Sequence, residues 1–400
     1  MKTLYVINHS HTDIGYTARQ EEIEMYHVDF IKQAIDIIED ELLHHEKSPF
    51  VWTCENYWQV ENFMKHASES YKEKFKQYLE LGNIDMSLNY LNMTELVDEQ
   101  VLNHTLKRGQ KFVEQMNRQI NSAMTADING FSWSYCSALL NNGVQNLFTC
   151  IHAHHGLYPL YKNQMPFWWE DQTGRKLLVW NGEHYHFGNE LYIMPDAQSS
   201  YQIQDEYNGD VSTPQLEVAH KRINRYFSDL EKRGYPYDFA PVMISGFISD
   251  NAGPNEKILE SIDNWNELYG DQINIQMVGL NSFFEIVRNQ YSDQIPTYSG
   301  DWNDWWADGV GSTPAATKIY RDAQRKYHLA ELLADNESEN DNRFKEAEQN
   351  MMLYAEHTWG YSSSVSAPWN TMVNELEYRK SGYATQASQK INSFVDDDCR

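Results

Sequence analysis

Apolar stretches of strand length alternate with amphipathic stretches of helix length along most of the chain, and this alternation constrains the fold more than any other feature. The strand-length stretches lie at residues 4–8, 50–54, 84–88, 124–128, 147–151, 177–181, 241–245 and 273–278. The helical patterns between them lie at residues 22–40, 57–79, 98–119, 214–232 and 257–268. Such alternation predicts a parallel sheet with crossover helices. Periodicity alone leaves a barrel and a large open sheet as alternatives.

The pattern becomes wholly helical near residue 312. Ser312, Thr313 and Pro314 predict a helix start, because hydroxyl side chains cap helices and proline is favoured in the first turn. From there the chain is helical to about residue 354, with a break around 336–342, and a further helix is expected over 372–394. We therefore expect an α/β domain over 1–311 and a helical bundle over 312–400.

Composition excludes several classes of function. The 400 residues include 32 Lys and Arg against 58 Asp and Glu, a formal net charge of −26. This balance argues against binding to nucleic-acid phosphates or anionic membranes, both of which need clustered basic residues. The four cysteines show no CxxC pairing, so they predict neither a disulfide framework nor a thiolate zinc site. Without a leader or a long apolar run, we expect a cytoplasmic protein.

Polar residues cluster directly after the predicted strands. In parallel α/β architectures, ligands bind beyond the carboxyl ends of the strands. The residues found there are His9, His11 and Asp13; Glu55 and Asn56; 89–92; Asp127; His152, His154 and His155; and Asp250. These side chains are expected to converge on one face.

His11 and Asp13 form the first candidate for metal binding. Residues two apart on an extended segment point the same way, so one imidazole and one carboxylate can reach a single ion. Such a pair suits zinc or another divalent metal. A hydrogen-bonded His–Asp pair without a metal is the alternative.

Three more side chains are candidate site residues, and each also has an ordinary structural explanation. Asp127 follows a predicted strand, where a lone Asp often caps a helix. Asp250 precedes a Gly-Pro pair, where an Asx-turn would also explain it. His357 closes a helical pattern in the stretch AEHTWG, where the alternatives are a favourable interaction with the helix dipole only and a role as a further metal ligand.

The loop 300–309, with the sequence GDWNDWWADG, is dense in tryptophan and aspartate. Aromatic faces beside carboxylates suit sugars, because a pyranose has an apolar C–H face and a rim of hydroxyl groups. A sugar-stacking loop is the favoured interpretation. A plug at a domain junction is the alternative.

Taken in order, HSHTDIGYT, MTADINGFSW, the 300–309 loop and AEHTWG resemble the N-terminal catalytic domain of family 38 glycoside hydrolases, the zinc-dependent retaining α-mannosidases. FVWTCENYW and LNYLNMTELVDE fit between them, and the resemblance spans residues 1 to about 365. It implies an irregular seven-stranded parallel α/β barrel followed by a helical bundle. The turn after Asp127 departs from the usual Asp-Pro-Phe-Gly-His pattern and resembles a divergent microbial branch. Family members also continue through β-sandwich domains, whereas this sequence stops at Arg400.

The resemblance also implies roles for individual residues. The implied zinc ligands, with another divalent metal left open, are His11, Asp13, Asp127 and His357. Asp127 matches the nucleophile, and Asp250 aligns with the acid/base, whereas His9 has no assigned role. The expected substrate contacts are Tyr16, Glu55, Trp302, Asp304, Trp305 and Trp306.

The implied function is retaining, metal-assisted hydrolysis of α-linked glycosides. A metal-dependent carbohydrate deacetylase is the main alternative, because it too uses an Asp/His metal site at strand ends. A sugar-binding module without turnover is the third. The expected partner is a carbohydrate, with no nucleic acid and no membrane, and the sequence leaves a homo-oligomer open.

Overall fold

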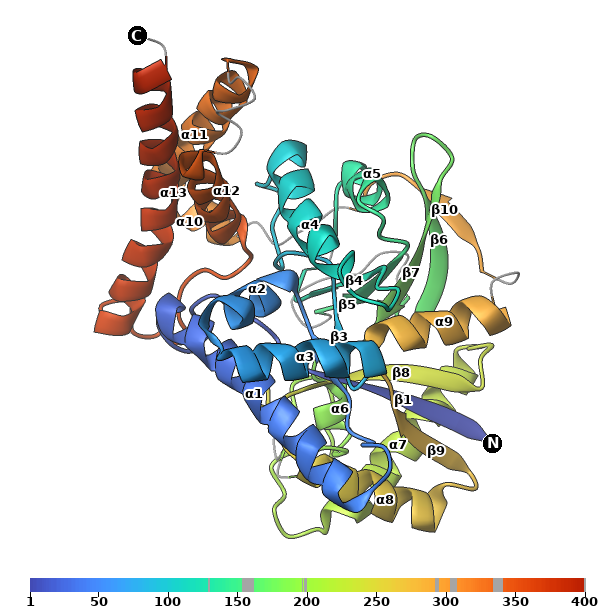
Figure 1. Ribbon diagram of the computed structural model, residues 1–400. Helices are drawn as coiled ribbons and strands as arrows, with labels where there is room; N and C mark the ends of the chain where they lie inside the picture. The colour runs from blue at the N-terminus through green and yellow to red at the C-terminus, as the bar shows by residue number, and fades with distance from the viewer. Residues whose placement is uncertain are drawn as a thin grey trace.

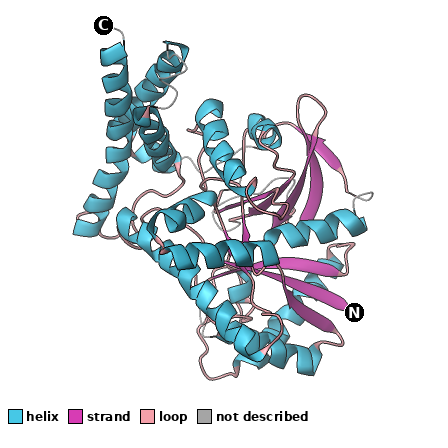
Figure 2. Cartoon of the chain, viewed as in Figure 1, coloured by secondary structure: helices cyan, strands magenta, loops and turns pink. Residues whose placement is uncertain are grey.

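The computed structural model describes residues 1–128, 130–152, 162–195, 197, 200–291, 295–302, 308–333 and 341–398. Its strands are β1 (Lys2–His9), β2 (Trp52–Cys54), β3 (Ile84–Met86), β4 (Ser122–Ala126), β5 (Asn146–Cys150), β6 (Met165–Glu170), β7 (Lys176–Gly182), β8 (Phe239–Ser245), β9 (Ile273–Met277) and β10 (Thr297–Ser299). Its helices are α1 (Gln20–His44), α2 (Tyr57–His66), α3 (Glu69–Leu81), α4 (Glu99–Val113), α5 (Trp133–Asn141), α6 (Phe187–Glu190), α7 (Gln215–Lys232), α8 (Lys257–Tyr269), α9 (Leu280–Tyr291), α10 (Asp308–Ser312), α11 (Pro314–Leu333), α12 (Asn342–Ala355) and α13 (Thr371–Asp398). The predicted alternation of strands and helices is therefore present (Figure 2).

The strands form three small sheets in the described part of the chain. Their orders are β8-β1-β9, β10-β6-β7-β5-β4 and β2-β3. All the strand pairs are parallel except β6 with β7. The expected single seven-stranded parallel barrel is thus not confirmed, since the sheets are separate and one of them is mixed.

Strands of two different sheets nevertheless share one core. Inward side chains of β1, β4, β5, β7 and β8 belong to one hydrophobic cluster, which includes Ile7, Met124, Phe148, Trp180 and Met243. A polar link also joins the sheets, because Gln164 accepts from the indole of Trp180 at 2.8 Å and donates to the carbonyl of Pro241 at 2.6 Å. The shared core fixes the strand ends relative to one another.

Two helix predictions need correction. The expected helix over 57–79 is two helices, α2 and α3, because the side chain of Ser68 caps the start of α3 by accepting from the backbone N–H of Tyr71. The expected helix over 98–119 begins after the cap residue Asp98 but ends at Val113. Competing caps and turns decide helix ends, and periodicity does not register them.

Strands β6 and β10 were not expected from the sequence. β6 forms a hairpin with β7 around a turn in which Asp171 accepts from the backbone N–H groups of Thr173 and Arg175, both at 2.9 Å. The hairpin extends the sheet at its edge, where β10 then pairs with β6 (Figure 1). β10 has only three residues, all exposed, and β6 contains Pro166, which argues against a strand at that position.

Helices α11, α12 and α13 pack side by side, apart from the sheets (Figure 1). α11 begins at Pro314, as the sequence predicts, while residues 334–340 of the expected break lie outside the described part. The ammonium of Lys380 in α13 donates to the carbonyls of Leu353 and Glu356 at 2.9 and 2.8 Å. These bonds tie α13 to the carboxyl end of α12, directly before His357. No described helix is long and apolar enough to cross a membrane.

Candidate metal centre

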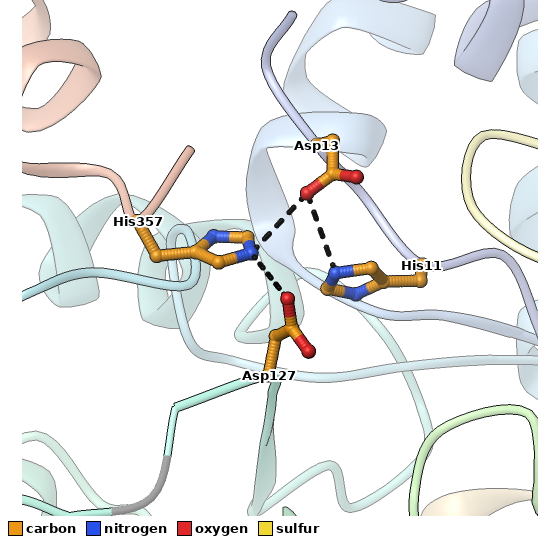
Figure 3. Close-up of side chains that lie close together, drawn as sticks. All are labelled: His11, Asp13, Asp127 and His357. Atoms are coloured by element: carbon orange, nitrogen blue, oxygen red, sulfur yellow. Dashed lines mark ion pairs between the residues drawn. The ribbon is translucent and has the colours of Figure 1, made fainter. Parts of the chain in front are cut away.

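Four side chains from distant parts of the sequence come together at the ends of the strands. Ligand atoms of His11, Asp13, Asp127 and His357 all lie within 4.8 Å of one another, and all four residues are buried. Oδ1 of Asp13 lies 3.5 Å from Nε2 of His11 and 3.2 Å from Nε2 of His357. Oδ2 of Asp127 lies 3.6 Å from the same nitrogen of His357 (Figure 3).

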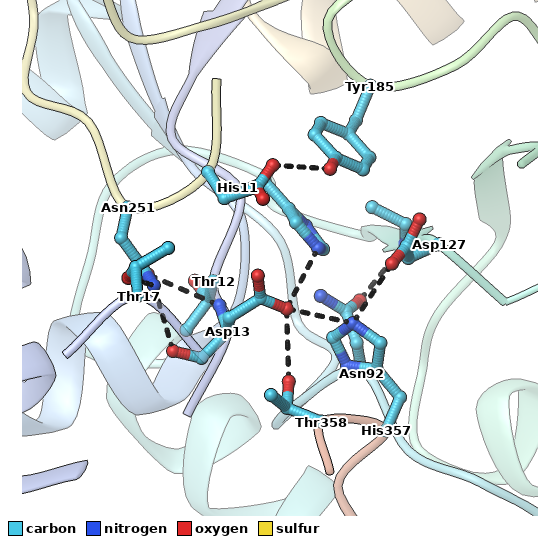
Figure 4. Close-up of polar contacts among 12 residues, drawn as sticks. His11, Thr12, Asp13, Thr17, Asn92, Asp127, Tyr185, Asn251, His357 and Thr358 are labelled. Carbon is cyan, nitrogen blue, oxygen red and sulfur yellow. Dashed lines mark hydrogen bonds and ion pairs between the residues drawn. The ribbon is translucent and has the colours of Figure 1, made fainter. Parts of the chain in front are cut away.

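The segment after β1 is held in place by the end of β8 and the loop that follows it. The backbone N–H of His11 donates to Oγ of Ser245 at 2.9 Å, and its carbonyl accepts from the N–H of Asn251 at 2.9 Å. The Asn251 side chain accepts from the N–H of Asp13 and donates to its carbonyl (Figure 4). Asn251 therefore positions Asp13 rather than forming only a local turn. The chain then turns at Gly15, whose φ of 115° favours glycine.

Asp127 directly follows β4 with its backbone in the left-handed region, at φ 70°. This conformation costs about 1 kcal/mol or more for a residue with a side chain, so it is found where the surroundings enforce it. One such constraint is Asn92, whose side-chain oxygen accepts from the N–H of Ala126 at 3.0 Å. The turn aims the carboxylate into the cluster and excludes a simple helix-capping role for Asp127.

His357 reaches the cluster because its segment is bonded to residues 92–94. The N–H of His357 donates to the carbonyl of Asn92 at 2.8 Å, and the N–H of Thr94 donates to the carbonyl of Ala355 at 2.7 Å. Met93 and Glu356 form an antiparallel bridge between these two bonds. The hydroxyl of Thr358 then donates to Oδ1 of Asp13 at 3.0 Å (Figure 4).

Each imidazole of the cluster is also held by a buried carboxylate. Nδ1 of His11 lies 3.2 Å from Glu55, and Nδ1 of His357 lies 2.8 Å from Glu356. Both rings therefore turn Nε2 towards the two aspartates. A histidine that bonds a carboxylate through one nitrogen and offers the other is the usual arrangement of a metal ligand in proteins. Two imidazoles and two carboxylates are also a donor set that suits zinc and similar divalent ions.

The cluster carries strongly perturbed charges. Burial favours the neutral forms of His11 and His357, but the carboxylates of Glu55 and Glu356, respectively, outweigh it and hold the pKa of each imidazole well above its ordinary value. Burial would raise the pKa of Asp13, yet bonds to His11 and His357 lower it to about 2. Asp127 is likewise held well below its ordinary pKa, by His184 and His357. Both aspartates thus present anionic oxygens to a cation.

Asp250 lies beside the cluster with an opposite shift. Burial, and then the charge of Asp13, raise its pKa above the ordinary value, with a smaller contribution from Asp127. The hydroxyl of Tyr185 donates to Oδ1 of Asp250, and the ring of Tyr185 stacks on His11 at 3.9 Å. Two carboxyl groups in one site thus have pKa values shifted in opposite directions.

The expected substrate contacts lie in different surroundings. Tyr16 is partly exposed, and burial and then the negative charges of Asp13 and Asp250 raise its pKa, so it lies at the rim of the site. Glu55 is fully buried between His9 and His11, which leaves no surface for a sugar. Trp302 stacks on Trp169 at 4.9 Å. Asp304, Trp305 and Trp306 lie outside the described residues, as do His154 and His155.

Sequence reasoning missed several side chains that surround the cluster. They are His184 and Tyr185 after β7, Glu356, and Lys380; His152 was noticed after its strand but given no role. The same rule that found Asp127 would have found His184, since GEHYH follows a predicted strand directly. No sequence pattern around Lys380 indicates a role in the site, because only the packing of α13 brings its ammonium to Glu356.

Comparison with known families gives one extended match. Residues 1–301 match the family described as "Glycosyl hydrolases family 38 N-terminal domain". No curated protein matches the chain.

The chain also resembles solved structures. An alpha-mannosidase from Enterococcus faecalis V583 is 16% identical with a TM-score of 0.71, and the match covers 100% of this chain and 42% of that one. A glycosyl hydrolase family 38 protein from Enterococcus faecalis is 13% identical with a TM-score of 0.63, covering 100% and 40%. A 4-alpha-glucanotransferase from Thermococcus litoralis is 8% identical with a TM-score of 0.51, covering 96% and 60%. The chain thus spans about two fifths of the length of the first two.

Proposed function

We propose, from the premise that this chain belongs to family 38 of the glycosyl hydrolases, that it hydrolyses α-linked, mannoside-type glycosides by a retaining, metal-assisted mechanism. The family membership supports a glycoside hydrolase and a carbohydrate substrate. The observation that carries the finer proposal is the convergence of His11, Asp13, Asp127 and His357 on one buried point.

The proposed metal is zinc, held by those four residues. Bound there, zinc would supply Lewis-acid polarisation of sugar hydroxyl groups. The two histidines fit this role because Glu55 and Glu356 already fix their orientation. We accordingly propose that Glu55 positions His11 and His9, in place of the sugar contact expected from the sequence.

Asp127 and Asp250 divide the two carboxylate roles of a retaining glycosidase. Asp127 is ionised well below neutral pH, so it can attack the anomeric carbon as the leaving oxygen departs. Asp250 has a raised pKa and can hold a proton for that oxygen, then take one from the attacking water. The hydroxyl of Tyr185 orients Asp250 through its hydrogen bond. Tyr16, at the rim, is proposed to contact the sugar.

The remaining parts of the proposal concern organisation. We propose that residues 1–311 form the catalytic domain and that residues 312–400 form a bundle which supplies His357. The indole of Trp302 packs against Phe131, Phe167 and Trp169 but is only partly buried, and we propose that its accessible part contacts the sugar. A cytoplasmic location fits the described cysteines Cys54, Cys136 and Cys150, which are buried and free.

The test combines metal analysis of the purified full chain with a screen of nitrophenyl α-glycosides. We expect one tightly bound equivalent of zinc, release of nitrophenol from the α-mannoside, and a product whose anomeric configuration is retained by NMR. An inverted product would reject the assignment of Asp127 as nucleophile. Acetate release from acetylated sugars without glycoside hydrolysis would favour the deacetylase instead, and zinc and sugar binding without either reaction would favour a binding module.

A further inference from the structure

The carboxylate of Asp127 faces two different groups of histidines. Its Oδ2 lies 3.6 Å from Nε2 of His357, in the cluster described above. Its Oδ1 lies 3.1 Å from Nε2 of His152 and 3.7 Å from Nε2 of His184. Each oxygen of one carboxylate therefore has its own set of imidazole nitrogens.

Strand register builds the second group. β4, β5 and β7 are adjacent parallel strands, and Ala126, Cys150 and Gly182 are aligned across them at their carboxyl ends. Asp127 follows β4 directly, while His152 and His184 each lie two residues past their aligned partner. The two imidazole rings consequently come to lie 4.8 Å apart, centre to centre.

The group is buried and close enough to share an ion. Ligand atoms of Asp127, His152 and His184 lie within 4.8 Å of one another. Their side chains are 11%, 7% and 1% exposed, respectively. Glu190 supplies a further carboxylate near the group. Its Oε1 lies 2.9 Å from Nε2 of His186, and the ring of His186 lies 4.3 Å from the ring of His184.

We propose that Asp127, His152 and His184 form a second divalent-metal site that shares the Asp127 carboxylate with the first. Two imidazoles and one carboxylate oxygen suit zinc or cobalt and leave one tetrahedral position for water. An ion at this site engages Oδ1 of Asp127 and withdraws electron density from the carboxylate. Under the proposed function, an excess of metal therefore inhibits hydrolysis. The binding itself does not depend on that function.

Calorimetric titration of the metal-free full chain with Zn²⁺ tests the site, with metal analysis after gel filtration. We expect two binding steps, the second weaker than the first. His184→Ala and His152→Ala should each weaken the second step by at least tenfold. His45→Ala, which removes an exposed imidazole far from the cluster in sequence, should keep both steps. A single step in the wild type, or a second step unchanged in both variants, overturns the proposal.

A measurement on the wild type covers the case in which a variant does not fold. With Co²⁺, a second equivalent bound through the shared carboxylate should couple magnetically to the first and change its EPR signal. Two independent, additive signals would place the second ion elsewhere and overturn the proposal.

Activity separates this proposal from the proposed function. Hydrolysis that falls as zinc rises above one equivalent supports both. Two coupled ions in a protein that hydrolyses no glycoside would sustain the second site and reject the glycosidase. Hydrolysis with one bound ion and no inhibition by excess zinc would support the glycosidase and reject the second metal site. His152 and His184 would then serve only as hydrogen-bonding partners of Asp127.

Discussion

Oδ1 of Asp13 and Nε2 of His357 lie 3.2 Å apart, although the two residues come from opposite ends of the chain. The hydroxyl of Thr358 donates to the same carboxylate oxygen at 3.0 Å. The segment after α12 thus completes a cluster that the loop after β1 begins. The candidate metal centre accordingly depends on docking of the helices that precede and follow His357.

Removing His357 tests the ligand assignment. We expect His357→Ala to lower zinc affinity by at least 10²-fold, because the variant loses one of four donors and leaves Glu356 buried without its imidazole. The measurement is competition with a chromophoric chelator. His45→Ala is the matched control, and unchanged affinity in His357→Ala would remove this residue from the metal shell.

A substitution of Lys380 tests whether Glu356 positions His357 for metal binding. Its ammonium is buried, lies 3.2 Å from Oε2 of Glu356, and stands 4.1 Å over the ring of Trp359. Lys380→Met keeps the volume but removes the ammonium that does most to keep buried Glu356 ionised, so the carboxyl group should be protonated more readily and hold the imidazole of His357 less firmly. We expect zinc affinity to fall about 10–100-fold, with altered d–d bands of the Co²⁺-loaded protein.

An exposed lysine supplies the control for that experiment. Lys65→Met removes a surface cation that pairs only with Glu24 among the described contacts. Its zinc affinity and cobalt spectrum should match the wild type. Equal spectra for Lys380→Met and the wild type would show that Lys380 only stabilises the packing of α13.

Asp127→Asn tests the nucleophile. The amide is nearly the same size as the carboxylate but cannot attack carbon, so turnover should fall by about 10³-fold or more. The variant loses the contribution that the lowered pKa of Asp127 makes to stability at neutral pH, so circular dichroism should first confirm that it is folded. Exogenous azide should restore product with inverted configuration, and a fully active variant would exclude Asp127 as nucleophile.

Asp250→Asn tests the acid through pH dependence. Because the raised pKa keeps Asp250 protonated to higher pH, the acid form is lost and activity falls as pH rises through that pKa. The variant should lose this basic limb, with kcat/KM down about 10²–10⁴-fold for substrates with poor leaving groups. The loss should be smaller for nitrophenyl glycosides, whose leaving group needs little protonation. A basic limb that persists in the variant belongs to another group.

Glu183 offers a prediction on stability. Burial raises its pKa to about 7, although Tyr226 and Asn163 donate to its two oxygens. A carboxyl group whose folded pKa is raised stabilises the fold below its unfolded pKa and loses that contribution as pH rises through the folded value. The wild type should therefore lose stability between pH 5 and pH 8, whereas Glu183→Gln should not. The free energy of unfolding of the variant should rise relative to that of the wild type by about 2–3 kcal/mol over this range. Denaturant unfolding at both pH values measures this difference.

The sequence by itself determined the alternation of strands and helices, because hydrophobic periodicity is local. It also indicated where the candidate site residues lie, since strand ends are visible as apolar runs that stop. Asp127 and the pair His11 and Asp13 were found in this way, and His184 could have been. His357 was a candidate from the helix end where it lies, and the family resemblance assigned it to the same metal site.

Only the tertiary structure decided what surrounds these groups. The break between α2 and α3, the β6–β7 hairpin and the three-sheet arrangement depend on caps and non-local pairing. Glu55 was expected to touch sugar but is buried against His9 and His11, and Lys380 reaches Glu356 from the last helix. Burial and long-range charge set the pKa values of such groups, and neither is a property of residues adjacent in sequence.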